Sequence, residues 1–77
     1  MFNWFAARDD VKQQMAELEE RISGLREELR QVVEGTAESI TTQRILLVRE
    51  QELERARLHA EFIEYQIAKF RAKMLRR

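Results

Sequence analysis

The sequence lacks cysteine and proline, and it has two glycines and one histidine in 77 residues. Without cysteine there are no disulfides and no thiolate metal ligands, and the single histidine, His59, cannot build an imidazole-rich metal site. No segment approaches the ~20 apolar residues that a bilayer-spanning helix needs. The N-terminal segment MFNWFAARDD also lacks the basic start and long apolar stretch of a secretory signal. We therefore expect a cytoplasmic protein with no cofactor and no stable membrane insertion.

The residues that are abundant favour helices. Alanine, leucine, glutamate, arginine and glutamine dominate, and no segment alternates between apolar and polar residues as a strand does. A chain of 77 residues forms at most one domain with a small core. The composition thus predicts an all-α protein that self-associates.

Two heptad repeats of apolar residues run through the chain. The first occupies every core position over residues 11–32: Val11, Met15, Leu18, Ile22, Leu25, Leu29 and Val32. The second does the same over residues 53–74: Leu53, Ala56, Ala60, Ile63, Ile67, Phe70 and Met74. The two repeats are three residues out of phase. This break predicts two helices that form a coiled-coil-like antiparallel hairpin.

We expect a first helix over about residues 9–34, a turn over about 35–41 and a second helix over about 42–75. Asp9 favours a helix start, because acidic side chains complement the helix dipole in a first turn. Gly35 can adopt the left-handed conformation that ends many helices.

Two alternatives to these boundaries stay open. Thr36 can cap a second helix that starts earlier, and Ser39 one that starts slightly later. The chain could also form one continuous helix in a parallel coiled coil. That helix would need a three-residue stammer, which overwinds the supercoil, and it would place Thr36, Ser39 and Gln43 in the seam.

Charge is distributed unevenly between the two halves of the chain. Residues 1–38 hold nine acids and five bases, a net charge of −4, whereas residues 39–77 hold five acids and nine bases, a net charge of +4. This asymmetry favours pairing of the two different helices. Arg49 occupies a core position of the second heptad, so we expect it to form an ion pair across the hairpin. The available partners are Glu20, Glu27 and Glu28.

The second helix has apolar residues on a second face, roughly opposite its heptad seam. At spacings of three and four residues this face carries Ile40, Arg44, Leu47, Gln51, Glu54, Leu58, Phe62 and Tyr65. A helix that is apolar on two sides is buried on two sides. We therefore predict that hairpins assemble into a homo-oligomeric helical bundle, as a dimer or a larger oligomer.

Both ends of the chain carry candidate binding residues. The N-terminal aromatics Phe2, Trp4 and Phe5 could close the core beside Ile63, Ile67 and Phe70, bind a partner, or rest at a membrane interface. The C-terminal bases are Lys69, Arg71, Lys73, Arg76 and Arg77. They could form a solvated helix end, contact nucleic acid, or meet an acidic protein or membrane surface.

No pattern indicates catalysis, so we expect a protein that is not an enzyme. His59 has no carboxylate on its own helix face, and the sequence contains no glycine-rich phosphate loop. The leading hypothesis is a protein-interaction module that acts as an adaptor, assembly factor or inhibitor. Its expected contact residues are Trp4, Phe5, Leu58, Phe62 and Tyr65. The alternatives are a nucleic-acid-binding regulator that uses the basic C-terminus, and a purely structural oligomer or scaffold subunit.

Overall fold

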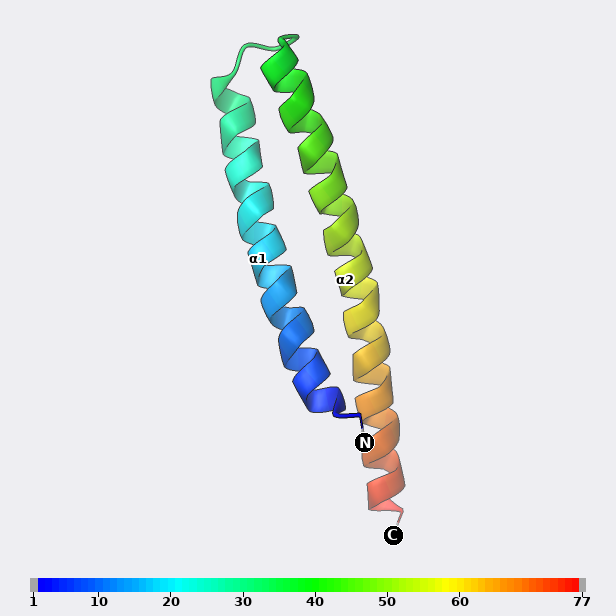
Figure 1. Ribbon diagram of the computed structural model, residues 1–77. Helices are drawn as coiled ribbons and strands as arrows, with labels where there is room; N and C mark the ends of the chain where they lie inside the picture. The colour runs from blue at the N-terminus through cyan, green and yellow to red at the C-terminus, as the bar shows by residue number, and fades with distance from the viewer. Residues whose placement is uncertain (1, 77) are drawn as a thin grey trace.

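The computed structural model describes residues 2–76 and contains two helices, α1 (Trp4–Gln31) and α2 (Ala37–Leu75). The helices lie side by side and antiparallel along an elongated body of 63 × 18 × 14 Å (Figure 1). We call the end with the turn the closed end, and the end where the chain starts and finishes the open end. The predicted all-α hairpin is confirmed, and the single continuous helix is wrong.

The helix α1 starts earlier than the expected position near residue 9. The side chain of Asn3 caps it by accepting hydrogen bonds from the backbone N–H groups of Phe5 at 3.0 Å and Ala6 at 3.1 Å. Asparagine is among the best N-cap residues, so the helix begins five residues before Asp9, the residue expected at its start. The N-terminal aromatics consequently lie in the first turn of α1 and just before it.

The turn is shorter than the expected 35–41 segment. The α1 helix ends at Gln31, and Val32 has an extended backbone with φ −95° and ψ 152°. The N–H of Thr36 donates to the carbonyl oxygen of Val33 at 3.4 Å, which closes a tight turn with Gly35 at its third position. Gly35 has φ +84°, as that position of a type II turn requires. Its predicted left-handed conformation is confirmed, although it shapes the turn rather than the helix end.

Thr36 caps α2, so α2 starts at Ala37 instead of near residue 42. The hydroxyl oxygen of Thr36 accepts a hydrogen bond from the N–H of Ser39 at 3.2 Å. The same hydroxyl donates to the carbonyl oxygen of Val33 at 2.7 Å. These two bonds fix the direction in which the chain enters α2.

The core lies in the heptad seam between the helices and forms two connected clusters. Towards the open end, buried Val11, Ile63 and Ile67 pack with Trp4, Ala7, Met15 and Ala60. In the middle of the hairpin, buried Leu18, Ile22, Leu53 and Ala56 pack with Met15 and Leu46. Ile63 and Ile67 are almost completely buried, at 0% and 1% exposed. The most deeply buried part of the hairpin is therefore next to its open end.

The seam becomes polar near the closed end. Ser39 and Thr42 of α2 are buried, whereas the facing α1 residues Leu25, Leu29 and Val32 are only half-buried. The hydroxyl of Ser39 accepts a weak hydrogen bond from the Gln43 amide at 3.4 Å. Small hydroxyl side chains bury less apolar area than leucine, so this end contributes less to stability.

At the other end, α2 projects beyond the start of α1 (Figure 1). Phe70 and Met74 were expected in the seam, but they are 47% and 59% exposed. Phe70 lies beside only the first turn of α1, where it lines an open hollow, and Met74 lies beyond that turn. The second heptad repeat is thus buried only as far as Ile67.

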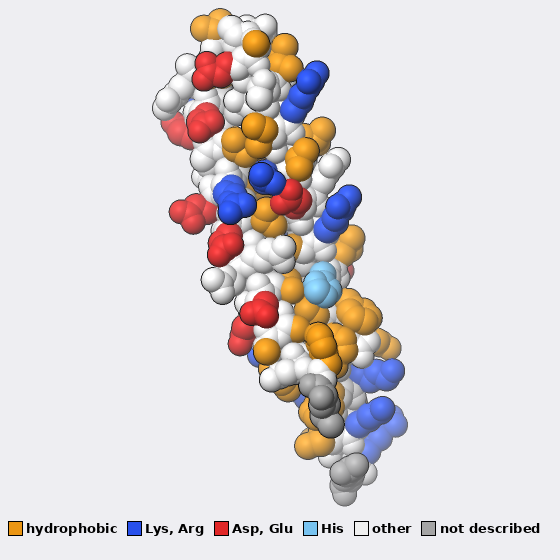
Figure 2. Space-filling view, in the orientation of Figure 1, with side chains coloured by type: hydrophobic (Ala, Val, Ile, Leu, Met, Phe, Trp, Pro, Cys, Tyr) orange, Lys and Arg blue, Asp and Glu red, His pale blue; other side chains and the backbone are white. Residues whose placement is uncertain are grey.

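Two ion pairs join the helices: Arg8 with Glu64, and Arg26 with Glu50, each at 3.8 Å. In both pairs the base belongs to α1 and the acid to α2. On the face in Figure 2, acidic side chains lie mostly over α1 and basic ones mostly over α2. The net charges of the two halves therefore do not determine these particular contacts, and exposed pairs of this kind contribute little.

The expected ion pair of Arg49 across the hairpin is wrong. Its guanidinium lies 2.7 Å from the carboxylate of Glu52, three residues further along the same helix. The Arg49 side chain is 35% exposed, so it leaves the seam and reaches solvent beside its neighbour.

Candidate partner-binding surface

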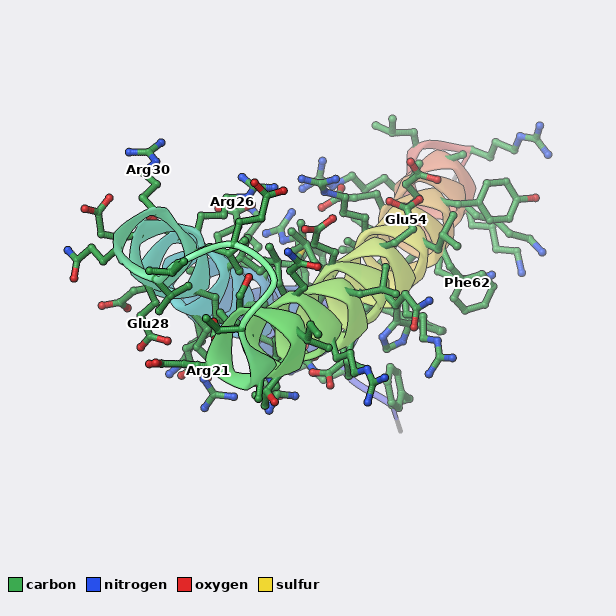
Figure 3. The ribbon with its side chains drawn as sticks, turned by 90° about the horizontal axis from the view of Figure 1, so that it is seen from above. Arg21, Arg26, Glu28, Arg30, Glu54 and Phe62 are labelled. Atoms are coloured by element: carbon green, nitrogen blue, oxygen red, sulfur yellow. The ribbon has the colours of Figure 1, made fainter. Side chains whose placement is uncertain are left out.

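The outer face of α2 carries a continuous stripe of exposed residues that α1 does not cover. This outer stripe consists of Ile40, Arg44, Leu47, Gln51, Glu54, Leu58, Phe62 and Tyr65. Its five apolar side chains are 44–62% exposed. Phe62 points away from α1 in Figure 3, whereas its neighbour Ile63 is completely buried against α1. One helix therefore has one apolar face in the core and another in solvent.

The spacing of these residues explains the geometry. Successive residues of a helix are about 100° apart, so positions three and four apart share a face. Ile63 and Ile67 share the face of α2 that is buried against α1. Leu58, Phe62 and Tyr65 share the exposed face, which lies about half a turn around the helix. Full burial of a large apolar side chain contributes about 1.5–3 kcal/mol, so covering the outer stripe would stabilise a complex considerably.

Trp4 connects the core to the outer stripe. It is half-buried against the cluster of Val11, Ile63 and Ile67. Its indole meets the ring of Phe62 edge to face, with centroids 5.8 Å apart, and the ring of Phe2 in the same manner at 4.5 Å. The expectation that the N-terminal aromatics close the core is confirmed for Trp4, and this contact also holds Phe62 in place.

Phe5 lies apart from the outer stripe, in a second environment at the open end. Its ring is 39% exposed, and the guanidinium carbons of Arg8 and Arg71 lie 5.5 and 5.9 Å from its centroid. Phe5 is also on the wall of an open hollow of about 440 Å³, lined by Phe2, Asn3, Trp4, Phe5, Ile67 and Phe70. The five predicted contact residues therefore do not form a single patch. Leu58, Phe62 and Tyr65 share the stripe, Trp4 supports it, and Phe5 belongs to the open end.

The basic residues lie on the projecting end of α2. Lys69, Arg71, Lys73 and Arg76 are all exposed there, and no acid follows Glu64 in the sequence. Arg77, which was predicted with them, lies outside the described residues. Apolar side chains are interspersed with these bases, and Figure 2 shows orange and blue side chains together over this part of the molecule. This end offers cations to an anionic partner.

The sequence pattern missed two exposed apolar residues of α2 that belong neither to the outer stripe nor to the seam. Ile45 and Val48 are 41% and 48% exposed. They lie between the stripe and the seam, so neither repeat includes them. Val48 could have been found from the sequence, because it lies four residues after Arg44 and three before Gln51 and therefore borders the outer stripe.

The groove between the helices has the chemistry of a solvated surface. It measures about 710 Å³ and is lined mostly by charged side chains of both signs, among them Arg26, Glu50 and Arg57. Within residues 2–76, no three His, Asp or Glu side chains come together as metal ligands.

Comparisons with protein-family models, curated proteins and solved structures found no similar protein. In the described part of the chain, neither helix combines the length and the apolar character needed to cross a membrane.

Proposed function

We propose that this protein is a small protein-interaction module that self-associates through the outer stripe of α2 and works as a cytoplasmic adaptor, assembly factor or inhibitor. The observation that supports this proposal is the second apolar face of α2, which is exposed along the length of the hairpin. Exposed apolar patches of this kind mark interaction sites in stable proteins.

The small size of the core supports the same proposal. The hairpin has two helices and buries seven apolar residues in its seam, and its closed end is packed around hydroxyl groups. A single core of this size rarely supplies more than a few kcal/mol. Covering the outer stripe with another copy would add burial that the hairpin alone cannot provide.

Within the outer stripe, Phe62 and Tyr65 are the expected anchors. They are large aromatic residues, and such side chains more often carry interface energy than lysine or rim arginine. Phe62 is already ordered by its contact with Trp4, so less conformational entropy is lost when a partner covers it.

The test compares two double variants by size-exclusion chromatography with light scattering. Phe62→Glu with Tyr65→Glu places two charges in the outer stripe and should shift the protein to monomer. Met74→Glu with Leu75→Glu is the matched control, because these side chains are also large, apolar and exposed, at 59% and 87%, but lie outside the stripe. Circular dichroism should show that both variants stay helical. Equal effects of the two variants on the mass would contradict the proposal.

A second candidate function is nucleic-acid binding at the projecting end of α2, which the cluster of four exposed bases favours. Counterion release then predicts that affinity for DNA or RNA falls steeply with added salt. Lys69→Gln with Lys73→Gln should weaken that binding without changing the mass of the protein. A gel shift that is absent at low salt would exclude this candidate.

A further inference from the structure

Seven of the eight residues of the outer stripe fall on a regular heptad, and Glu61 fills the remaining core-type position. Phe62, the eighth stripe residue, follows Glu61 directly and lies on the flank of this heptad. One set of core-type positions holds Arg44, Gln51, Leu58 and Tyr65, and the other holds Ile40, Leu47, Glu54 and Glu61. Glu61 is exposed and lies at the edge of the same face. These eight positions therefore have the spacing of a coiled-coil seam for which the hairpin provides no second helix, with Phe62 beside it.

We propose that the partner on this seam is a second copy of the chain, with the two α2 helices antiparallel in one particular register. This inference rests on the proposed function. In the proposed register the centre of symmetry lies between Gln51 and Glu54. Each layer of the seam then pairs one residue from each copy, and each pairing occurs twice by symmetry. The pairings are Leu47 with Leu58, Ile40 with Tyr65, Arg44 with Glu61, and Gln51 with Glu54.

In this register apolar residues face apolar residues, polar residues face polar residues, and the two residues of opposite charge face each other. The four apolar residues of the seam pair with one another, and the two central layers each pair an amide with a carboxylate. Arg44 and Glu61 form no ion pair with any other residue in the described part of the hairpin. They are 17 residues apart on α2, roughly 25 Å along a helix, so they cannot meet within one chain. In the antiparallel pair each one meets its opposite charge.

Other arrangements of the same seam are worse. A parallel pair in register sets Arg44 against Arg44 and Glu54 against Glu54, and like charges in a seam are strongly unfavourable. Sliding the antiparallel pair by one heptad in one direction sets Glu54 against Leu58. Sliding it in the other sets Leu47 against Gln51 and leaves Tyr65 without a partner layer. Of these four arrangements, only the proposed register buries all the apolar layers and also sets Arg44 against Glu61.

The resulting dimer has a simple layout. The two α2 helices would lie at its centre. Each α1 would cover the side of its own α2 that faces away from the other copy, because Phe62 beside the seam points away from α1 (Figure 3). The interface is isologous, so one mutation changes two layers at once. The basic projecting ends of α2 lie at opposite ends of the dimer.

A charge reversal tests the register. Arg44→Glu should raise the dissociation constant of the dimer by at least roughly tenfold, because it creates two like-charge layers. Glu61→Arg alone should do the same. The double variant Arg44→Glu with Glu61→Arg should restore the wild-type constant to within a few fold, and only a contact between copies can produce this rescue. Reversal of Arg30, an exposed charge on α1 away from the seam, is the control.

A distance measurement tests the orientation independently. The chain has no cysteine, so single cysteines can carry spin labels. With Lys69→Cys the antiparallel register predicts labels separated by roughly 50 Å along the axis, from the ~1.5 Å rise per residue. A parallel pair would bring them to within roughly 20 Å. Labels at Arg55→Cys lie near the centre and should be close in either orientation, which reports association itself.

The outcomes separate the two proposals. A wild-type protein that stays monomeric contradicts self-association and the register together. A dimer with short Lys69→Cys distances, or one in which the double charge reversal gives no rescue, overturns the antiparallel register and leaves self-association standing. Long distances at Lys69→Cys, short ones at Arg55→Cys and rescue by the double variant support both.

Discussion

The two glycines should respond in opposite directions to the same substitution. Gly24 lies within α1, and a methyl group added there meets no other atom within 4 Å. Gly24→Ala should therefore stabilise the protein by about 0.8–1 kcal/mol, the difference in helix propensity between the two residues. Gly35 has φ +84° in the turn. Gly35→Ala should destabilise the protein by about 1–2 kcal/mol, because a Cβ atom disfavours this conformation.

Thermal unfolding followed by circular dichroism measures both effects. In a domain of this size each kcal/mol shifts Tm by about 4–8 °C, so the two variants should differ by at least about 7 °C. Protein concentration must be the same in all samples, because self-association raises the apparent stability.

The comparison also distinguishes the hairpin from a continuous helix. In a continuous helix both glycines would be interior helical positions, and both alanine variants would be more stable than the wild type. Stabilisation by Gly35→Ala would therefore refute the turn. Destabilisation by Gly24→Ala would instead show that the space beside Gly24 is occupied, for example by a partner on α1.

Three further predictions concern a core residue, a buried hydroxyl group and the basic end of α2. Ile63→Ala should cost about 2–5 kcal/mol in chemical denaturation, because Ile63 is 0% exposed at the centre of the larger cluster; a loss below 1 kcal/mol would mean that the seam is not packed as described. Thr42→Val should be neutral or stabilising by up to about 1 kcal/mol in the same assay, since it replaces a buried hydroxyl with a methyl group of similar size; a large loss would reveal a hydrogen bond essential to the closed end. Lys73→Gln with Arg76→Gln should leave the affinity for a protein partner within a few fold at physiological salt, because both residues lie beyond the outer stripe; titration calorimetry measures this affinity. A large loss of affinity with a steep salt dependence would favour nucleic acid as the partner.

The sequence predicted the hairpin and its seam because a heptad repeat constrains a helix strongly. Residues such as Leu18, Ile22 and Ile63 must share a face, and the phase break at Gly35 prevents a single helix from keeping them all buried. The exposed face of α2 was also predictable, since the spacing of Leu58, Phe62 and Tyr65 is independent of how the hairpin is built. Whether that face binds another copy stays a prediction.

Other details depended on competition between similar signals. Asn3 and Asp9 are both good helix caps, and only the contacts of the aromatic turn with the core decide in favour of Asn3. The position of the turn determines which residues of α2 lie beside the start of α1, and this leaves Phe70 and Met74 about half exposed. Arg49 had several carboxylates within reach, and its choice of Glu52 depends on side-chain rotamers that a heptad pattern does not specify.

The most direct test of the central claim is the mass of the wild-type protein in solution. Sedimentation equilibrium at micromolar concentrations should give twice the chain mass of 9.3 kDa or a higher multiple, and the value should decrease on dilution. A mass of 9.3 kDa that persists at the highest concentrations would show that the outer stripe does not bind another copy.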